Sequence, residues 1–225
     1  ETLYYLLVFN NGSNHETYQF LSEYFTKGKI DYLMNSKENL GVTNSLSIIL
    51  SMAPGKYICR VDDDVFFKEN WLENSIKIIE TFPNVGFVTP FPVRSSFNKY
   101  YSSAYLTTYK NITGMEYLDH NWKNSWDEIV AYGLGTNLEG FIQSNPLNGL
   151  KKLKYKGICA YPLGSHFVSL SKKETIQKIL PFPYNDRLIG GTEKDKTSLI
   201  NLYDKALNDM GYVKLTTDGC YVEHI

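Results

Sequence analysis

Strand-length apolar runs alternate with amphipathic segments through residues 3–89, and this order constrains the fold more than any other feature. Short β-branched runs bounded by Gly, Pro or Asn predict strands, and apolar residues at helical spacing predict helices. The predicted strands are Leu3–Phe9, Ile30–Met34, Tyr57–Val61 and Val85–Thr89, and the predicted helices follow Asn14, follow Gly41 and span Trp71–Phe82. Such alternation is typical of an α/β domain with a mostly parallel central sheet and helices on both faces.

The length, net charge and apolar runs of the chain exclude some classes of protein. The 225 residues are enough for one sizeable domain, expected over 1–225. The net charge of −1 does not indicate a nucleic-acid-binding protein, because such proteins usually carry an excess of positive charge. No apolar run approaches membrane-spanning length, and the first residues lack the basic region of a signal peptide.

The cysteines indicate the compartment. Cys59, Cys159 and Cys220 are odd in number, far apart and without metal-ligand spacing. This pattern favours reduced thiols in a reducing compartment. We therefore expect a cytoplasmic protein, with peripheral attachment to a membrane left open.

Three consecutive aspartates, Asp62, Asp63 and Asp64, come directly after the third predicted strand. Side chains alternate along an extended chain, so Asp62 and Asp64 can point the same way while Asp63 points away. Adjacent carboxylates repel one another, and a hard divalent cation, Mg²⁺ or Mn²⁺, offsets that repulsion. Open α/β sheets bind ligands beyond the carboxyl ends of their strands, where this triplet lies. The triplet predicts a metal site, with a solvated acidic turn as the alternative.

Five motifs in order carry a family resemblance. They are NNGSNHET at 10–17, NLGVTNS at 39–45, GKYICRVDDD at 55–64, GGTEKD at 190–195 and YVEHI at 221–225. This combination resembles the nucleotide-diphospho-sugar transferases of GT-A fold, and among them glycosyltransferase family 2. In that family an Asp-Asn-Gly-Ser-like turn, an Asn-x-Gly segment and an Asp-x-Asp motif are followed by a Gly-Gly-x-Glu-Asp region and a strand that ends in histidine. The resemblance covers nearly the whole chain except the segment from Val93 to Lys156.

The resemblance implies a metal-dependent, inverting transfer of a hexosyl or N-acetylhexosaminyl group from a nucleotide-diphosphate donor, a UDP-sugar, to an acceptor hydroxyl. It assigns Asp62, Asp64 and His224 to a Mn²⁺ or Mg²⁺ ion, and it makes Glu193 or Asp195 the general base. The residues that it assigns to the nucleotide sugar are Asn10, Asn11, Ser13, Asn39, Asp62 and Asp63.

The chain departs from the family pattern in three places. The turn that usually carries an aspartate for the uracil has Asn10 and Asn11 instead. The usual Glu-Asp pair is spread over Glu193-Lys194-Asp195, so either carboxylate can be the base. The family's first strand should precede Leu3 and is missing from this sequence, so either a natural N-terminal segment is lacking or another part of the chain fills its place.

The segment from Val93 to Lys156 has weak periodicity and interleaves aromatic residues with Asn, Ser, Thr and Gly. We interpret it as an irregular, aromatic-rich insert on the acceptor side, because long segments of this kind are usually functional loops or lids. Trp122 and Trp126 would share one face of a helix and could stack on sugar rings. The alternative is that both anchor the insert to the core.

Two other functions stay open. A non-catalytic carbohydrate- or nucleotide-binding module could keep the fold and lack the base. A sugar-phosphate nucleotidyltransferase would need a Gly-x-Gly-x-x-Arg loop near the start of the chain, which this sequence lacks. The sugar, the acceptor, the oligomeric state and membership of a longer polypeptide are left open.

Overall fold

The computed structural model describes residues 3–94, 107–182 and 202–224, with the side chain of His224 left out. The chain packs as two compact units. Unit 1 comprises Glu1–Ile58 and Lys173–Tyr203, and unit 2 comprises Cys59–Lys172 and Asp204–Ile225. The expectation of one domain over 1–225 stays a prediction.

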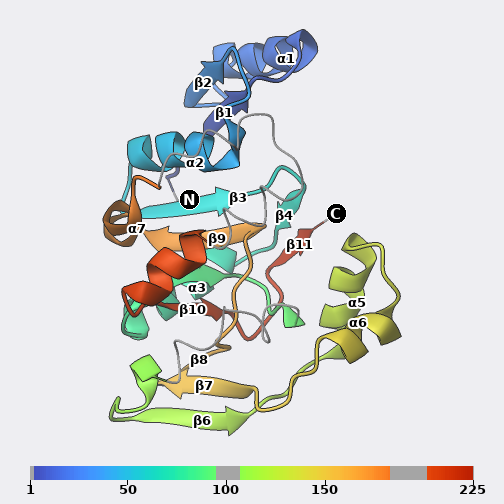
Figure 1. The fold of residues 1–225 in the computed structure, drawn as a ribbon, viewed down its shortest axis with the longest axis vertical. Helices are drawn as coiled ribbons and strands as arrows, with labels where there is room; N and C mark the ends of the chain where they lie inside the picture. Colours follow the sequence, from blue (N-terminus) through green and yellow to red (C-terminus); the bar gives the residue numbers. More distant parts are fainter. Residues whose placement is uncertain (1–2, 95–106, 183–201, 225) are drawn as a thin grey trace. The chain divides into compact units, whose positions relative to one another are not determined.

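Unit 1 contains the first strand–helix repeats (Figure 1). Its elements are β1 (Leu7–Asn11), α1 (His15–Thr26), β2 (Tyr32–Ser36), α2 (Gly41–Met52) and α7 (Lys173–Ile179). Strands β1 and β2 pair in parallel, as the strand–helix–strand order predicted. The helix predicted to follow Asn14 is confirmed as α1, and Asn14 caps it, because its side chain accepts a hydrogen bond from the Thr17 amide at 2.9 Å.

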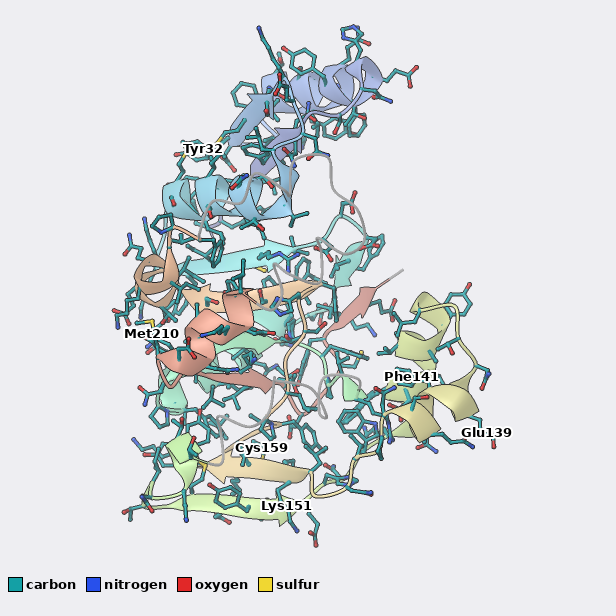
Figure 2. All side chains as sticks on the ribbon, in the orientation of Figure 1. Tyr32, Glu139, Phe141, Lys151, Cys159 and Met210 are labelled. Carbon is teal, nitrogen blue, oxygen red and sulfur yellow. The ribbon has the colours of Figure 1, made fainter. Side chains whose placement is uncertain are left out.

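The apolar face predicted for α1 is less buried than its periodicity suggests. No residue of α1 is fully buried, and Phe20 and Phe25 are 55% and 46% exposed. Tyr32 of β2, labelled in Figure 2, is also exposed. Because β1 and β2 form a sheet of two strands, unit 1 offers this helix little surface to cover.

Unit 2 is built on a four-stranded sheet in the order β10-β5-β9-β3. Its strands are β3 (Tyr57–Val61, of which the first two residues belong to unit 1), β5 (Val85–Thr89), β9 (Val168–Lys172) and β10 (Val213–Thr216). Strand β10 runs parallel to β5, whereas β9 runs antiparallel to it. The α/β class is therefore confirmed with a mixed sheet, and a mostly parallel sheet is not confirmed.

The predicted third helix is confirmed as α3 (Trp71–Thr81), whose inward face carries the buried residues Ser75, Ile78 and Ile79. Its contacts are with β5, β8 and β9, so it packs on the sheet of unit 2. A helix over residues 202–209 precedes β10. Together they supply apolar cover for the sheet.

The segment expected to be irregular contains regular elements. They are β6 (Met115–Asp119), α5 (Asn124–Gly133), α6 (Leu138–Ser144) and β7 (Lys151–Tyr155), with β8 (Ile158–Ala160) just beyond. Strands β6, β7 and β8 form a three-stranded antiparallel sheet. Local periodicity missed it because β6 pairs with β7 over a long sequence separation and both strands are rich in charged residues.

The core of unit 2 gathers residues from the sheet, the insert and the C-terminal strand. The cluster comprises Phe91, Val93, Trp126, Leu147, Leu150, Tyr161, Leu163, Val168 and Val222. Cys59, Cys159 and Cys220 are free thiols. Within the described residues, no helix is long and apolar enough to cross a membrane.

Candidate functional site

The turn after β1, here called the asparagine turn (Asn10–Ser13), holds its shape through its own amide side chains. Asn10 is 5% exposed, its Oδ1 accepts from the Ser13 amide at 3.2 Å, and its Nδ2 donates to Asn35 Oδ1 at 3.1 Å. Both the oxygen and the nitrogen of the Asn10 side-chain amide are thus hydrogen-bonded within the protein. It positions the turn, and Ser13 stays exposed beside it.

The asparagine turn is joined to the start of α2. Asn11 Oδ1 accepts from the Leu40 amide at 2.8 Å, and Asn11 Nδ2 donates to Asn39 Oδ1 at 3.1 Å. Gly12 has φ +74°, and a Cβ there would lie 2.5 Å from the backbone nitrogen of Asn39. Only glycine fits this approach without displacing the neighbouring backbone. The structure therefore brings together the four residues predicted in unit 1 to bind the nucleotide sugar, namely Asn10, Asn11, Ser13 and Asn39.

The acidic turn (Asp62–Asp64) in unit 2 links β3 to β4 (Val65–Phe67). Asp63 is exposed, whereas Asp62 and Asp64 are half-buried. Residues 63 and 64 form a turn and not an extended strand, so the predicted common direction of Asp62 and Asp64 stays a prediction. The Asp62 amide donates to the Phe167 carbonyl at 2.8 Å. One carboxylate oxygen of Asp64 is shielded from solvent. The turn is thus fixed to the strand neighbouring β3 and presents its carboxylates unequally to solvent.

Arg60 provides a positive charge beside the acidic turn. Its Nη2 lies 3.1 Å from Asp62 Oδ1, and its Nη1 donates to the main-chain oxygen of His166. Because opposite charges attract, Arg60 offsets part of the repulsion within the triplet. Sequence reasoning missed Arg60, although a lone arginine in an otherwise apolar strand was a usable signal.

A buried charge network lies behind His166. Its Nε2 is 3.2 Å from Asp204 Oδ2, and Lys214 Nζ is 3.1 Å from Asp204 Oδ1. Burial lowers the pKa of Lys214, and the Asp204 carboxylate acts in the opposite direction. The loop that carries His166 and Phe167 to the acidic turn is therefore held in place by the buried contacts of His166 with Asp204 and of Asp204 with Lys214.

The C-terminal strand β11 (Val222–His224) pairs antiparallel with β4, and His224 is opposite Val65. This register brings the backbone of His224 next to the residue that follows Asp64. Carboxylates suit Mg²⁺ and Mn²⁺, and imidazole suits Mn²⁺, so the chemistry of this donor set fits the cation that the sequence predicted. Among the side chains that the structure describes, no three His, Cys, Asp or Glu residues gather as metal ligands, and His224 is not one of those side chains.

The remaining predicted site residues fall into two groups. Glu193 and Asp195 lie outside the described residues. Trp126 is 4% exposed and belongs to the core cluster of unit 2, so it anchors the insert in this structure. Trp122 is half-buried and packs edge-on against Trp126, with ring centroids 5.1 Å apart. A role for Trp122 towards an acceptor stays a prediction.

A buried ion pair within the insert also escaped sequence reasoning. Arg94 Nε and Nη2 donate to the two carboxylate oxygens of Asp127 at 2.9 and 2.8 Å. Trp122 Nε1 donates to the same carboxylate at 3.0 Å. The partners are 33 residues apart and no local pattern links them. They attach α5 to the segment that follows β5.

The chain also has measurable similarity to known proteins. Residues 2–138, more than half of the chain, match the family model for Glycosyl transferase family 2. A protein of Haemophilus influenzae described as an uncharacterized glycosyltransferase is 36% identical over 75 residues. That match covers 33% of this chain and 23% of the relative, so the matched stretch spans less than a quarter of that protein's length. By the extent of the family match, the chain belongs to glycosyl transferase family 2.

Proposed function

We propose that this domain is a metal-dependent, inverting glycosyltransferase that moves a hexosyl or N-acetylhexosaminyl group from a UDP-sugar to an acceptor hydroxyl. Family membership supports the general class. The pairing of β4 with β11 supports the proposed metal site, because β4 follows the acidic turn directly and β11 ends in His224. These segments come from distant parts of the sequence, and one cation site would need both.

In this proposal Asp62, Asp64 and His224 hold a Mn²⁺ or Mg²⁺ ion. When bound, the ion would offset the negative charge on the departing diphosphate as a Lewis acid. Arg60 orients the Asp62 carboxylate through its contact at 3.1 Å. The asparagine turn and Asn39 bind the nucleotide, with the internal hydrogen bonds of Asn10 and Asn11 presetting the turn.

The transfer itself would be a single displacement at the anomeric carbon. The acceptor oxygen forms the new C–O bond as the bond to the diphosphate oxygen breaks, and UDP leaves with the electron pair. Glu193 or Asp195 takes the proton from the acceptor hydroxyl as general base. One displacement inverts the anomeric configuration.

Calorimetric titration of UDP, with Mn²⁺ and again with EDTA, tests the donor side. Wild-type protein should bind UDP only with the metal, and Asp64→Asn should weaken that binding by about 100-fold or more. The expectation exceeds the roughly 10–100-fold cost of outer-shell changes, because Asp64 is proposed as a ligand itself.

The matched control is Glu69→Gln, which removes one negative charge from an exposed residue just after β4. It should bind UDP like the wild type, and both variants should keep the far-UV spectrum of the wild type. Wild-type UDP affinity in Asp64→Asn would eliminate the metal assignment. Release of sugar from the bound UDP-sugar then separates an enzyme from a module that only binds.

A further inference from the structure

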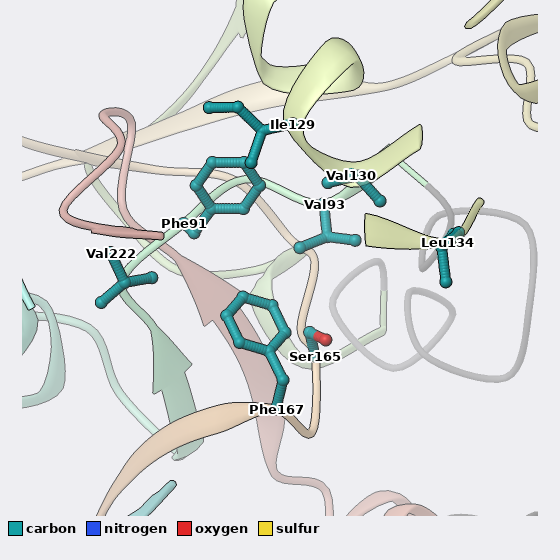
Figure 3. A pocket seen from close by; sticks show the side chains of 8 residues that line it. All are labelled: Phe91, Val93, Ile129, Val130, Leu134, Ser165, Phe167 and Val222. Atoms are coloured by element: carbon teal, nitrogen blue, oxygen red, sulfur yellow. The ribbon is translucent and has the colours of Figure 1, made fainter. Parts of the chain in front are cut away.

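An apolar pocket lies in unit 2 between α5 and the strand ends beneath it (Figure 3). It has a volume of about 200 Å³. Its lining residues are Phe91, Val93, Ile129, Val130, Leu134, Ser165, Phe167 and Val222. Ser165 is the one polar residue among them. Figure 3 shows Ile129 and Val130 of α5 facing Phe91 and Val93 across this space.

The pocket is larger than an ordinary packing defect. Protein interiors are close-packed, and voids larger than a water molecule are few. Apolar cavities stay dry, and one of about 150 Å³ in another protein accepts benzene. Leu134 at the end of α5 is 62% exposed, so the lining reaches the surface there. A space of this size and lining suits one aromatic ring or a short branched hydrocarbon group.

The walls of the pocket are fixed by polar contacts behind the apolar lining. The Arg94–Asp127 pair attaches α5 to the segment that carries Val93. The Ser165 amide donates to Thr89 Oγ1 at 2.9 Å, and the Ser165 carbonyl accepts from the same hydroxyl at 3.1 Å. The pocket is therefore formed in advance, which reduces the entropy lost when a ligand is ordered.

The pocket adjoins the acidic turn through two of its walls. The Phe167 carbonyl accepts the hydrogen bond of the Asp62 amide, and Val222 pairs with Phe67 in the β4–β11 ribbon that follows the turn. Two residues that line the pocket are thus joined through their backbones to the acidic turn and to the strand that follows it. Diphosphate, ribose and sugar hydroxyls need polar partners, which an apolar lining with one serine does not supply.

We propose that this pocket binds an apolar group of the acceptor, with the size of one aromatic ring or of a branched chain of up to about six carbons. The inference rests on the proposed function and names the class of acceptor for that site. The acceptor carries its hydroxyl beside such a group, and the pocket aligns that hydroxyl with the donor. Burial of the apolar group gives the acceptor its affinity.

Fluorine NMR titration with 4-fluorotoluene tests the pocket without any donor. Wild-type protein should bind the probe, and Leu134→Trp should weaken binding by about tenfold or more by filling the mouth. Ile129→Phe fills the pocket from its side wall and should have the same effect. Tyr132→Ala is the matched control, because Tyr132 is on the same helix, is 85% exposed and does not line the pocket.

UDP titration with Mn²⁺ on the same samples separates the two proposals. Probe binding that the filling variants weaken, with UDP binding unchanged, supports the pocket as an acceptor subsite. The pocket proposal is wrong if the protein binds UDP without binding the probe, or if Leu134→Trp and Tyr132→Ala lose the same amount of probe affinity. Neither result contradicts the proposed donor site. Probe binding without UDP binding in any condition overturns the proposed function and the acceptor assignment together.

Discussion

Replacing Arg94 by methionine should destabilise the protein by about 3–5 kcal/mol, because it leaves a buried carboxylate without its cation. The Arg94 and Asp127 side chains are 9% and 1% exposed, so solvent cannot take over the lost interaction. Two hydrogen bonds to Asp127, at 2.9 and 2.8 Å, disappear with the guanidinium, and so does its hydrogen bond to the Asn145 carbonyl at 3.4 Å. The indole N–H of Trp122 still reaches Asp127, but a neutral donor does not replace the charge.

The double variant Arg94→Met/Asp127→Leu should recover most of that loss. Apolar residues of similar volume often replace a buried ion pair without net cost, so removing both charges is less harmful than removing one. We expect a coupling energy of about 2 kcal/mol or more between the two substitutions. Urea unfolding measures it through tryptophan fluorescence and circular dichroism, since Trp122 and Trp126 adjoin the pair.

Lys154→Met is the control for the loss of one cation. Lys154 pairs with Glu116 at 3.1 Å between β7 and β6, and the two side chains are 37% and 53% exposed. Its removal should cost about 0–1 kcal/mol, as is usual for a solvated pair. The reasoning fails if Arg94→Met costs no more than about 1 kcal/mol, the range of surface pairs. It also fails if the double variant loses as much unfolding free energy as the two single variants lose together.

Two further predictions concern the asparagine turn and the third strand. Gly12→Ala should lower stability by more than about 1 kcal/mol and weaken UDP binding, since its Cβ would meet the Asn39 backbone at 2.5 Å. Gly28→Ala has a similar positive φ with no atom within 4 Å of its Cβ, so an equal effect on UDP binding would contradict the steric explanation. Burial raises the pKa of the Cys59 thiol from 9.0 to about 12, so iodoacetamide should label it far more slowly in native than in urea-unfolded protein, and equal rates would refute this. Because the pKa of Cys59 is higher in the folded than in the unfolded state, the stability linked to this thiol is retained below pH 9 and is lost as pH rises from about 9 towards 12. Urea unfolding of the wild type and of Cys59→Ala across that pH range measures the loss.

Much of unit 1 and the start of unit 2 could be predicted from the sequence, because their signals are local. Asn14 caps a helix, and Val85–Thr89 is a strand with the predicted bounds. The acidic triplet follows its strand directly, as expected, and the motif order predicts the family that the family match shows. Capping, periodicity and turn chemistry act between residues a few positions apart, so a single chain displays them.

Tertiary structure alone decided the direction of β9, the antiparallel sheet of the insert and the pairing of β4 with β11. It also placed Trp126 in the core, paired Arg94 with Asp127 and opened the pocket beneath α5. Each of these depends on residues distant in sequence, whose contact is set by how elements pack and by which charges must be neutralised once buried. The sequence thus determined the strand–helix order up to residue 89, the acidic triplet and the family, while the pairing of β4 with β11 required the folded chain.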